Sequence, residues 1–259
     1  MFIGYPNWLQ ALERQGYDDL PVPLFVKGMA AAGLKAGGYD HAWQYEYLRR
    51  GSRGEPLVWG GAESFADADK RRLLGSRLRD QFKDLTSWDA LAPIRADFLS
   101  KAHETSNLNW MSYVDLRLRL PELLLMRVDK MTMGVGLEAR VPFLDHELVT
   151  LAMSIPSARK APNGRLKHLL KTAVKDLVPT ELIERRKQGF GVPVDDLFAG
   201  RLSQIATKEL TRFCDETGLL DKKAVLQLIA SGQGSKTWYL LNLAMWWRHF
   251  IAGETLEVE

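Results

Sequence analysis

The stretch Leu166-Lys167-His168-Leu169-Leu170-Lys171-Thr172-Ala173-Val174-Lys175-Asp176-Leu177 carries the periodicity that decides the fold class. Its apolar side chains recur at intervals of three and four residues, whereas Lys167, Lys171 and Lys175 turn to the other side. An Asn-Gly pair precedes the stretch and Pro179 follows it, so the spacing predicts one helix between them. Such a helix packs on a core through its apolar face.

Segments with the same period extend through most of the sequence. Asp221 is a suitable N-cap for one of them, and Leu240, Ala244 and Trp247 share a face of another. Strand signals are nearly absent, since the short run Leu57-Val58-Trp59 can at most pair locally. The sequence therefore predicts a mainly α protein. Helices are expected at residues 40–50, 67–80, 87–103, 108–119, 122–133, 144–154, 221–232 and 235–253, and glycine-containing loops at 32–38, 51–61 and 231–235.

The domain organisation is expected to be simple. No internal repeat, low-complexity tract or long linker divides the 259 residues. A chain of this length can bury one large core. We expect a single helical domain over residues 1–253 and a frayed tail over residues 254–259, which holds three glutamates.

Composition excludes several classes of protein. The chain is 46% hydrophobic and 26% charged, and its formal charge of +3 is spread without a basic stripe, so neither nucleic acid nor a membrane is expected as a partner. The apolar window at residues 238–247 is far shorter than the roughly 20 residues that cross a bilayer. The single cysteine excludes a disulfide within the chain and indicates the reducing cytoplasm. The five histidines lack ligand spacing, so no metal site is expected.

The first candidate site lies between Arg127 and Asp145, where charged side chains stand among apolar residues. Pro142 disfavours helix at the residue before it, so residues 137–141 are expected to be extended, with Glu138 and Arg140 on the same side. Two interpretations are open: the charges form a structural ion-pair network, or the two side chains face one ligand together. Asp145 is expected to N-cap the following helix.

The second candidate is Arg185-Arg186-Lys187-Gln188-Gly189-Phe190-Gly191-Val192-Pro193, where three cations precede a turn bracketed by glycines. The ammonium of Lys187 and the backbone N–H groups around Gly189 and Gly191 suit a phosphate. The alternative is a solvated helix end, at which cations complement the helix dipole.

Three other features are expected to carry no chemistry. Ser231-Gly232-Gln233-Gly234-Ser235 looks like a phosphate-binding loop, but it follows a helix and lacks the lysine, so it is interpreted as a connection between helices. Cys214 and the pair Trp246-Trp247 are expected to be core side chains.

Residues Leu120-Pro121-Glu122-Leu123-Leu124 through Asp145, followed by Lys187-Gln188-Gly189-Phe190-Gly191-Val192-Pro193, resemble the C-terminal synthetase domain of glutamine-hydrolysing asparagine synthetases and their relatives. The run Leu-Glu-Ala-Arg-Val-Pro-Phe-Leu-Asp at residues 137–145 is a specific signature. The resemblance extends from Phe2 to about Phe250 and is loose over residues 7–105.

The resemblance implies that the chain is the helical C-terminal portion of an ATP-pyrophosphatase (adenine nucleotide alpha hydrolase-like) α/β synthetase domain, with its parallel sheet missing. The family's enzymes also carry an N-terminal glutaminase domain and a Ser-Gly-Gly-x-Asp-Ser nucleotide loop, and neither is in this sequence. We therefore expect a truncated part of a larger enzyme, inactive alone and binding neither ATP nor Mg²⁺ tightly. Because the absent sheet leaves an apolar helix face uncovered, we expect either self-association or local disorder near the N-terminus.

By resemblance, the parent enzyme uses ATP and Mg²⁺ to adenylate a small carboxylate, and glutamine-derived ammonia then displaces AMP to give an amide. Lys187 would neutralise charge on the phosphates, with Gly189 beside it. Glu138 and Arg140 would line the substrate side, Arg140 as a bidentate partner of the carboxylate. The partners would be the glutaminase and nucleotide-binding segments of the parent. The alternative function is a free-standing helical protein-interaction module derived from the family.

Overall fold

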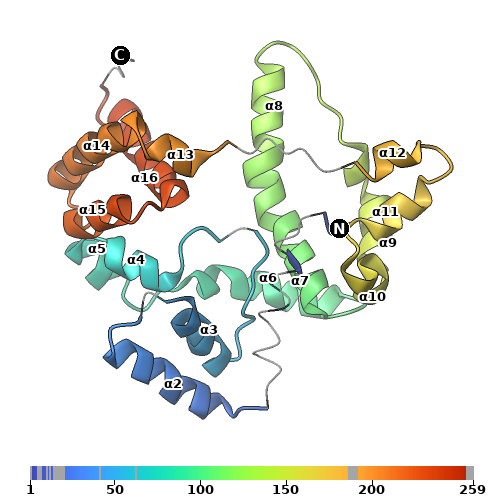
Figure 1. The fold of residues 1–259 in the computed structure, drawn as a ribbon, viewed down its shortest axis with the longest axis horizontal. Helices are drawn as coiled ribbons and strands as arrows, with labels where there is room; N and C mark the ends of the chain where they lie inside the picture. The colour runs from blue at the N-terminus through green and yellow to red at the C-terminus, as the bar shows by residue number, and fades with distance from the viewer. Residues whose placement is uncertain are drawn as a thin grey trace. The chain divides into compact units, whose positions relative to one another are not determined.

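A computed structural model describes residues 2–4, 8–9, 11, 13, 21–40, 42–61, 63–185 and 192–254. These residues form helices and connecting loops without a β-strand (Figure 1), which confirms the mainly α fold. They divide into two compact units, residues 1–63 with 87–187 as unit 1 and residues 64–86 with 188–259 as unit 2. This division does not test the expected single helical domain over residues 1–253, which stays a prediction.

Unit 1 consists of helices joined by turns and short loops. In chain order they are α2 (Leu24–Ala36), α3 (Trp43–Ser52), α6 (Ser87–Lys101), α7 (Asn107–Val114), η1 (Asp115–Leu125), α8 (Met126–Met133), η2 (Pro142–Leu144), α9 (His146–Ser154), α10 (Ser157–Lys160), η3 (Pro162–Gly164), α11 (His168–Ala173) and α12 (Thr180–Ile183).

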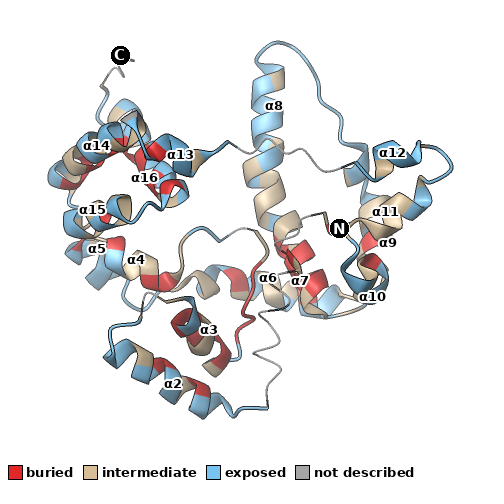
Figure 2. Ribbon diagram, viewed as in Figure 1, coloured by how far each residue is buried: buried red, intermediate tan, exposed pale blue. Residues whose placement is uncertain are grey.

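The core of unit 1 forms around α7, which Figure 2 shows largely in the colour of buried residues. On one side, Leu108 and Met111 pack with Ile3, Trp8 and Val58. A second apolar cluster consists of Trp59, Leu91, Phe98, Trp110 and Val114. The run Leu57-Val58-Trp59 is buried but forms no strand. Its Val58 carbonyl accepts a hydrogen bond from the Trp110 indole at 3.2 Å and not from the backbone of a neighbouring strand.

A buried guanidinium joins α3 to the loop that follows it. Arg50 is 1% exposed and donates to the Leu57 carbonyl at 2.9 Å, to Glu46 at 3.0 Å and to Glu63 at 3.1 Å. Its planar group also lies 3.6 Å from the centre of the Trp59 ring. A buried arginine is tolerated only when its donors are satisfied in this way, so these contacts hold Leu57, Trp59 and Glu63 against α3.

Unit 2 is a helical cluster with an apolar core. Its helices are α4 (Asp67–Leu73), α5 (Ser76–Gln81), α13 (Val194–Phe198), α14 (Arg201–Thr217), α15 (Lys222–Ala230), α16 (Gly234–Trp246) and η4 (Trp247–Ile251). The core includes Ala206, Leu210, Phe213 and Leu241. The predicted N-cap Asp221 is confirmed, since its carboxylate accepts from the Ala224 N–H at 2.8 Å. Glu254, expected in the frayed tail, instead accepts from Arg248 at 3.0 Å and also pairs with Arg212.

Several helix boundaries differ from the sequence prediction. Residues 32–36, expected in a loop, belong to α2, because Gly33 stays helical after a run of alanines. Helix α14 was not expected at all. The predicted helix over residues 166–177 is regular only from His168 to Ala173, since Lys167 takes a left-handed conformation with φ 55° and its N–H donates to the Ile3 carbonyl.

Pro121 does not break the helix that leads to the first candidate site. The sequence predicts separate helices over residues 108–119 and 122–133, whereas α7, η1 and α8 follow one another without a gap. Residues Asp115–Leu125 form a π-helix, in which Met126 N–H bonds the carbonyl of Pro121 five residues earlier. The wider π-helical turn accommodates Pro121, which has no N–H to donate, so the helix continues where the sequence predicts a break.

The Arg50 contacts lead to a stability prediction. Replacing Arg50 by Met removes the buried cation from Glu63 and leaves Glu46 with Arg49 alone, so the free energy of unfolding should fall by about 3 kcal/mol. Arg53→Met is the matched control, because the Arg53 side chain is 54% exposed and its loss should cost less than about 1 kcal/mol. Urea denaturation followed by far-UV circular dichroism measures both. Equal losses in the two variants would contradict the role of Arg50.

Candidate functional site

The signature segment follows α8 and is open to solvent. After the turn at Gly134-Val135-Gly136, residues 137–141 run without helix or strand until η2. Arg140 Nη2 lies 3.0 Å from Glu138 Oε1, and the two side chains are 83% and 67% exposed. Glu138 and Arg140 thus lie on the same side and pair, which is one of the two arrangements that the sequence left open. The predicted N-cap is confirmed, because Asp145 accepts from the N–H groups of Glu147 and Leu148.

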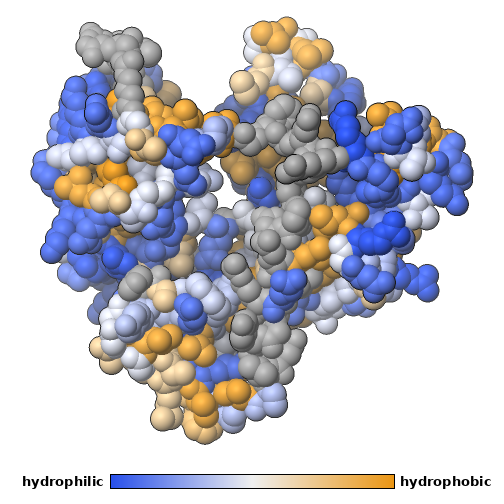
Figure 3. Space-filling view, in the orientation of Figure 1, coloured by the Kyte–Doolittle hydropathy of each residue, from blue (hydrophilic) through white to orange (hydrophobic). Residues whose placement is uncertain are grey.

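The apolar neighbourhood of this pair is exposed rather than buried. The sequence suggested charges set among core residues, but α8 contains no buried residue, as Figure 2 shows. Its neighbour charges Asp129 and Lys130 are exposed as well. Figure 3 shows hydrophobic surface at the end of this helix. The exposed apolar residues of this region are Leu124, Met126, Val128, Met131, Met133, Val135, Leu137, Val141 and Phe143.

An exposed ion pair of this kind adds little to stability, because water competes for both charges. A guanidinium and a carboxylate in one exposed segment remain available to an incoming group. The fork of Arg140 can bind a carboxylate through two parallel hydrogen bonds, while Glu138 can accept from an amine or hydroxyl. The geometry therefore suits a small molecule with both functions.

The second candidate, Arg185 to Pro193, is only partly described. Lys187 and Gly189 lie outside the described residues, so their predicted roles stay predictions. The chain is described up to Arg185, and just before it Glu184 Oε2 lies 2.7 Å from Lys171 Nζ. The structure brings Glu138 and Arg140 together and does not locate Lys187 relative to them.

Sequence reasoning also missed a half-buried carboxylate, Asp115, and a buried ammonium, Lys160. Asp115 accepts from the Gly61 N–H at 2.8 Å, and burial raises the pKa of its carboxyl group. Gly60 has φ 71°, and a Cβ there would lie 2.6 Å from Asp115 Oδ1, so only glycine fits this turn. Lys160 is 1% exposed at the end of α10. The two glycines were the only local signal, since the partners lie about fifty residues away in sequence.

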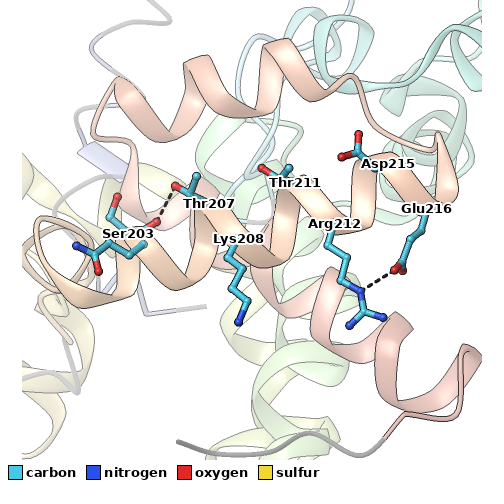
Figure 4. A pocket seen from close by; sticks show the side chains of 8 residues that line it. Ser203, Thr207, Lys208, Thr211, Arg212, Asp215 and Glu216 are labelled. Carbon is cyan, nitrogen blue, oxygen red and sulfur yellow. Dashed lines mark hydrogen bonds and ion pairs between the residues drawn. The ribbon is translucent and has the colours of Figure 1, made fainter.

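One hollow of unit 2 lies along one face of α14 and is lined by polar and charged residues (Figure 4). Lys208 and Thr211 line it, and Arg212 at its side donates to Glu216 at 2.6 Å. One exposed helix face with its arginine already paired offers no enclosed binding site, so we assign it no function.

The features expected to be inert fall on structural positions, with one exception. Cys214 is buried in the core of unit 2, where burial raises the pKa of its thiol to about 11. Residues 231–235 connect α15 to the first turn of α16, as predicted. Trp247 packs against the core, whereas Trp246 is 49% exposed, so its prediction as a core residue was wrong.

Within the part of the chain that the structure describes, no cluster of three or more His, Cys, Asp or Glu side chains is set to hold a metal ion. No helix among the described residues combines the length and the apolar character needed to cross a bilayer.

Comparison with known proteins extends the sequence signature. The sequence model of asparagine synthase matches residues 1–248. Glutamine-hydrolysing asparagine synthetase 1 of Bacillus subtilis is 28% identical over 256 residues, which cover 95% of this chain and 38% of that protein. The human glutamine-hydrolysing asparagine synthetase is 43% identical over 68 residues, which cover 25% of this chain and 12% of the human protein. The chain thus spans 38% of the length of the bacterial relative. No solved structure matches the chain.

The exposed pair leads to a second prediction. Arg140→Ala should change the free energy of unfolding by no more than about 0.5 kcal/mol, because the pair is solvated. Asp145→Ala is a control in the same segment, and it should cost about 1 kcal/mol through the lost N-cap. Urea denaturation again measures both. A loss above about 1.5 kcal/mol for Arg140→Ala would mean that the arginine is structural.

Proposed function

The chain belongs to the asparagine synthase family, and from that premise we propose that it forms the helical C-terminal part of a synthetase domain in an ATP-dependent amidotransferase. The observation that carries this proposal is the signature segment with its exposed Glu138–Arg140 pair. The family match over residues 1–248 supports it. Because the chain spans 38% of the relative's length, the activity belongs to the larger enzyme.

The proposed reaction has two steps. An oxygen of a small-molecule carboxylate attacks the α-phosphorus of ATP, the bond to the β-phosphate breaks, and pyrophosphate leaves. Ammonia from glutamine then attacks the acyl carbon, loses a proton, and AMP departs to leave an amide. Negative charge grows on phosphate oxygens in the first step and on the acyl oxygen in the second, so a fixed cation nearby lowers both barriers.

We assign this chain's residues as follows. Lys187 supplies the fixed cation, and the backbone at Gly189 helps to hold phosphate oxygens. Arg140 binds a carboxylate of the substrate, and Glu138 orients the arginine or accepts from the substrate's amine. ATP and its Mg²⁺ would be held chiefly by the nucleotide loop and acidic residues of the remaining enzyme, which the 259 residues do not contain.

A second candidate function is supported by one observation, the exposed apolar surface along η1, α8 and the loop after it. Apolar surface of this extent is typical of a protein–protein contact. A free-standing interaction module would use this surface without needing Lys187, and self-association through it stays a prediction. The two functions therefore differ in what the lysine contributes.

The amidotransferase proposal is tested by Lys187→Ala in the complete enzyme. Loss of one oriented electrostatic contact should lower amide synthesis about 10² to 10³-fold while glutamine hydrolysis stays largely intact. Arg185→Ala is the control, because Arg185 is an exposed cation two residues away. Amide formation and glutamate release are measured separately. Synthesis within a few-fold of wild type in Lys187→Ala would make the lysine a solvated helix end.

A further prediction concerns the 259-residue chain alone. It should neither hydrolyse glutamine nor exchange pyrophosphate into ATP with aspartate, because its single cysteine is buried in a core and no loop offers a phosphate cradle with acidic metal ligands. Isotope exchange assays with the purified chain measure this, with Lys187→Ala as the control for contaminants. Exchange that disappears in the variant would contradict the proposal.

A further inference from the structure

Unit 1 buries an ammonium group that the proposed reaction does not use. Lys160 and Asn109 are each 1% exposed, and Lys160 Nζ donates to Asn109 Oδ1 at 2.6 Å. Lys160 ends α10, whereas Asn109 lies in α7, so the bond joins segments 51 residues apart. A buried charge with a neutral acceptor is costly unless a counter-charge stands close by.

The counter-charge is Glu104, in the loop before α7. Its Oε2 accepts from Asn109 Nδ2 at 2.7 Å and from the Ser157 N–H at 2.6 Å, and its Oε1 accepts from Ser157 Oγ at 2.9 Å. One carboxylate thus binds α7 and the first residue of α10 together. Lys160, the last residue of α10, bonds the same asparagine. Both ends of this short helix are therefore anchored.

The electrostatic surroundings of Lys160 are sparse. Helix α7 brings no charged side chain, and Glu104 is the carboxylate that acts on the lysine. Helix α11, which contacts α10, carries His168 and Lys171. Burial lowers the pKa of Lys160 to about 8, and Glu104 opposes part of this shift. The folded pKa is below the ordinary 10.5, so burial of the ammonium lowers the stability of the folded chain at neutral pH. The free energy of unfolding therefore rises as the pH increases from about 8 to 10.5.

Helix α10 leads to a strained contact between Ile3 and Lys167, which we call the joint. Ile3 and Lys167 have φ of 49° and 55°, and the Lys167 N–H donates to the Ile3 carbonyl at 3.0 Å. Left-handed backbone at an isoleucine costs of the order of 1–3 kcal/mol and persists only where the surroundings hold it in place. The holding contacts are the burial of Ile3 and the anchor at α10.

Beyond the joint, the chain is held less firmly. No residue of α11 or α12 is buried, and their described link is the ion pair between Lys171 and Glu184 at 2.7 Å. Glu184 is three residues before Lys187. The position of this segment therefore depends on the contacts at its beginning, where α10 meets Glu104 and Asn109.

We propose that Glu104, Asn109 and Lys160 form a positioning cluster that fixes the segment from Ser157 to Arg185 on α7 and thereby sets where Lys187 acts. The three side chains touch no substrate. The proposal rests on the proposed function only for the role of Lys187, and the anchor itself is a property of this chain.

The anchor is tested by amide hydrogen exchange in the 259-residue chain with Glu104→Ala. This variant removes the acceptor of three hydrogen bonds and the counter-charge of Lys160, so exchange of the Lys167 amide should rise at least about 10-fold. The Val225 amide in unit 2 is the internal reference and should not change. Glu181→Ala, at an exposed position of α12, is the matched control. Exchange at Lys167 within two-fold of wild type would overturn the anchor.

A milder variant covers the case in which Glu104→Ala does not fold. Glu104→Gln keeps the shape of the side chain and removes its charge. The ¹³C NMR signal of Lys160 Cε should titrate near pH 8 in wild type and lower still in Glu104→Gln, because the carboxylate raises the pKa of the lysine. Titration of Lys160 at its ordinary value of 10.5 in wild type would overturn the buried cluster.

The positioning role is tested in the complete enzyme. Glu104→Gln should lower kcat of amide synthesis about 10-fold, with KM for the carboxylate and glutamine hydrolysis unchanged, and Glu181→Gln should do neither. Unchanged synthesis in Glu104→Gln, while Lys187→Ala abolishes it, would overturn the positioning role and leave the proposed function standing. Unchanged synthesis in Lys187→Ala would instead refute the proposed function, and the exchange experiment would still decide whether the anchor exists.

Discussion

Helix α7 has no exposed residue, and this constraint organises the whole of unit 1. Around its circumference, Met111 contributes to one apolar cluster and Trp110 to another, so both clusters depend on the same eight residues. Every polar group on such a helix must find a partner inside the protein. The Ser112 hydroxyl donates to a carbonyl of its own helix. The side chain of Asn109 instead finds its partners in Lys160 and Glu104. The burial of one helix thus requires the ionic contacts around it.

The two units reach stability by different means. Unit 2 has an apolar core that includes Leu210 and Phe213, and the ion pairs of Arg212 with Glu216 and of Lys222 with Asp215 lie at its surface. Unit 1 buries Arg50 and Lys160 while apolar residues such as Met131 and Val135 lie on its surface. Buried charges contribute more to a unique geometry than to stability, and exposed apolar groups contribute nothing until they are covered. Unit 1 is therefore built for a defined arrangement of its loops rather than for a large hydrophobic core.

Local patterns predicted local structure well. The N-caps at Asp145 and Asp221 and the pairing of Glu138 with Arg140 follow from neighbours in sequence, and the structure has all three. The helix at residues 201–217 was missed although Leu202, Ala206, Leu210 and Phe213 have helical spacing, because polar residues dilute the pattern. The shortened α11 and the continuous helix at Pro121 depend on distant or unusual hydrogen bonds, which periodicity does not encode.

The lone thiol of the chain gives experimental access to one unit at a time. Cys214 is the single cysteine in the sequence, and it lies in the core of unit 2 with its ionisation suppressed by burial. The thiolate is the reactive form, and it does not form in the closed core. A thiol-specific reagent therefore reacts with Cys214 only when that core opens. The rate of alkylation therefore reports the opening of the core of unit 2.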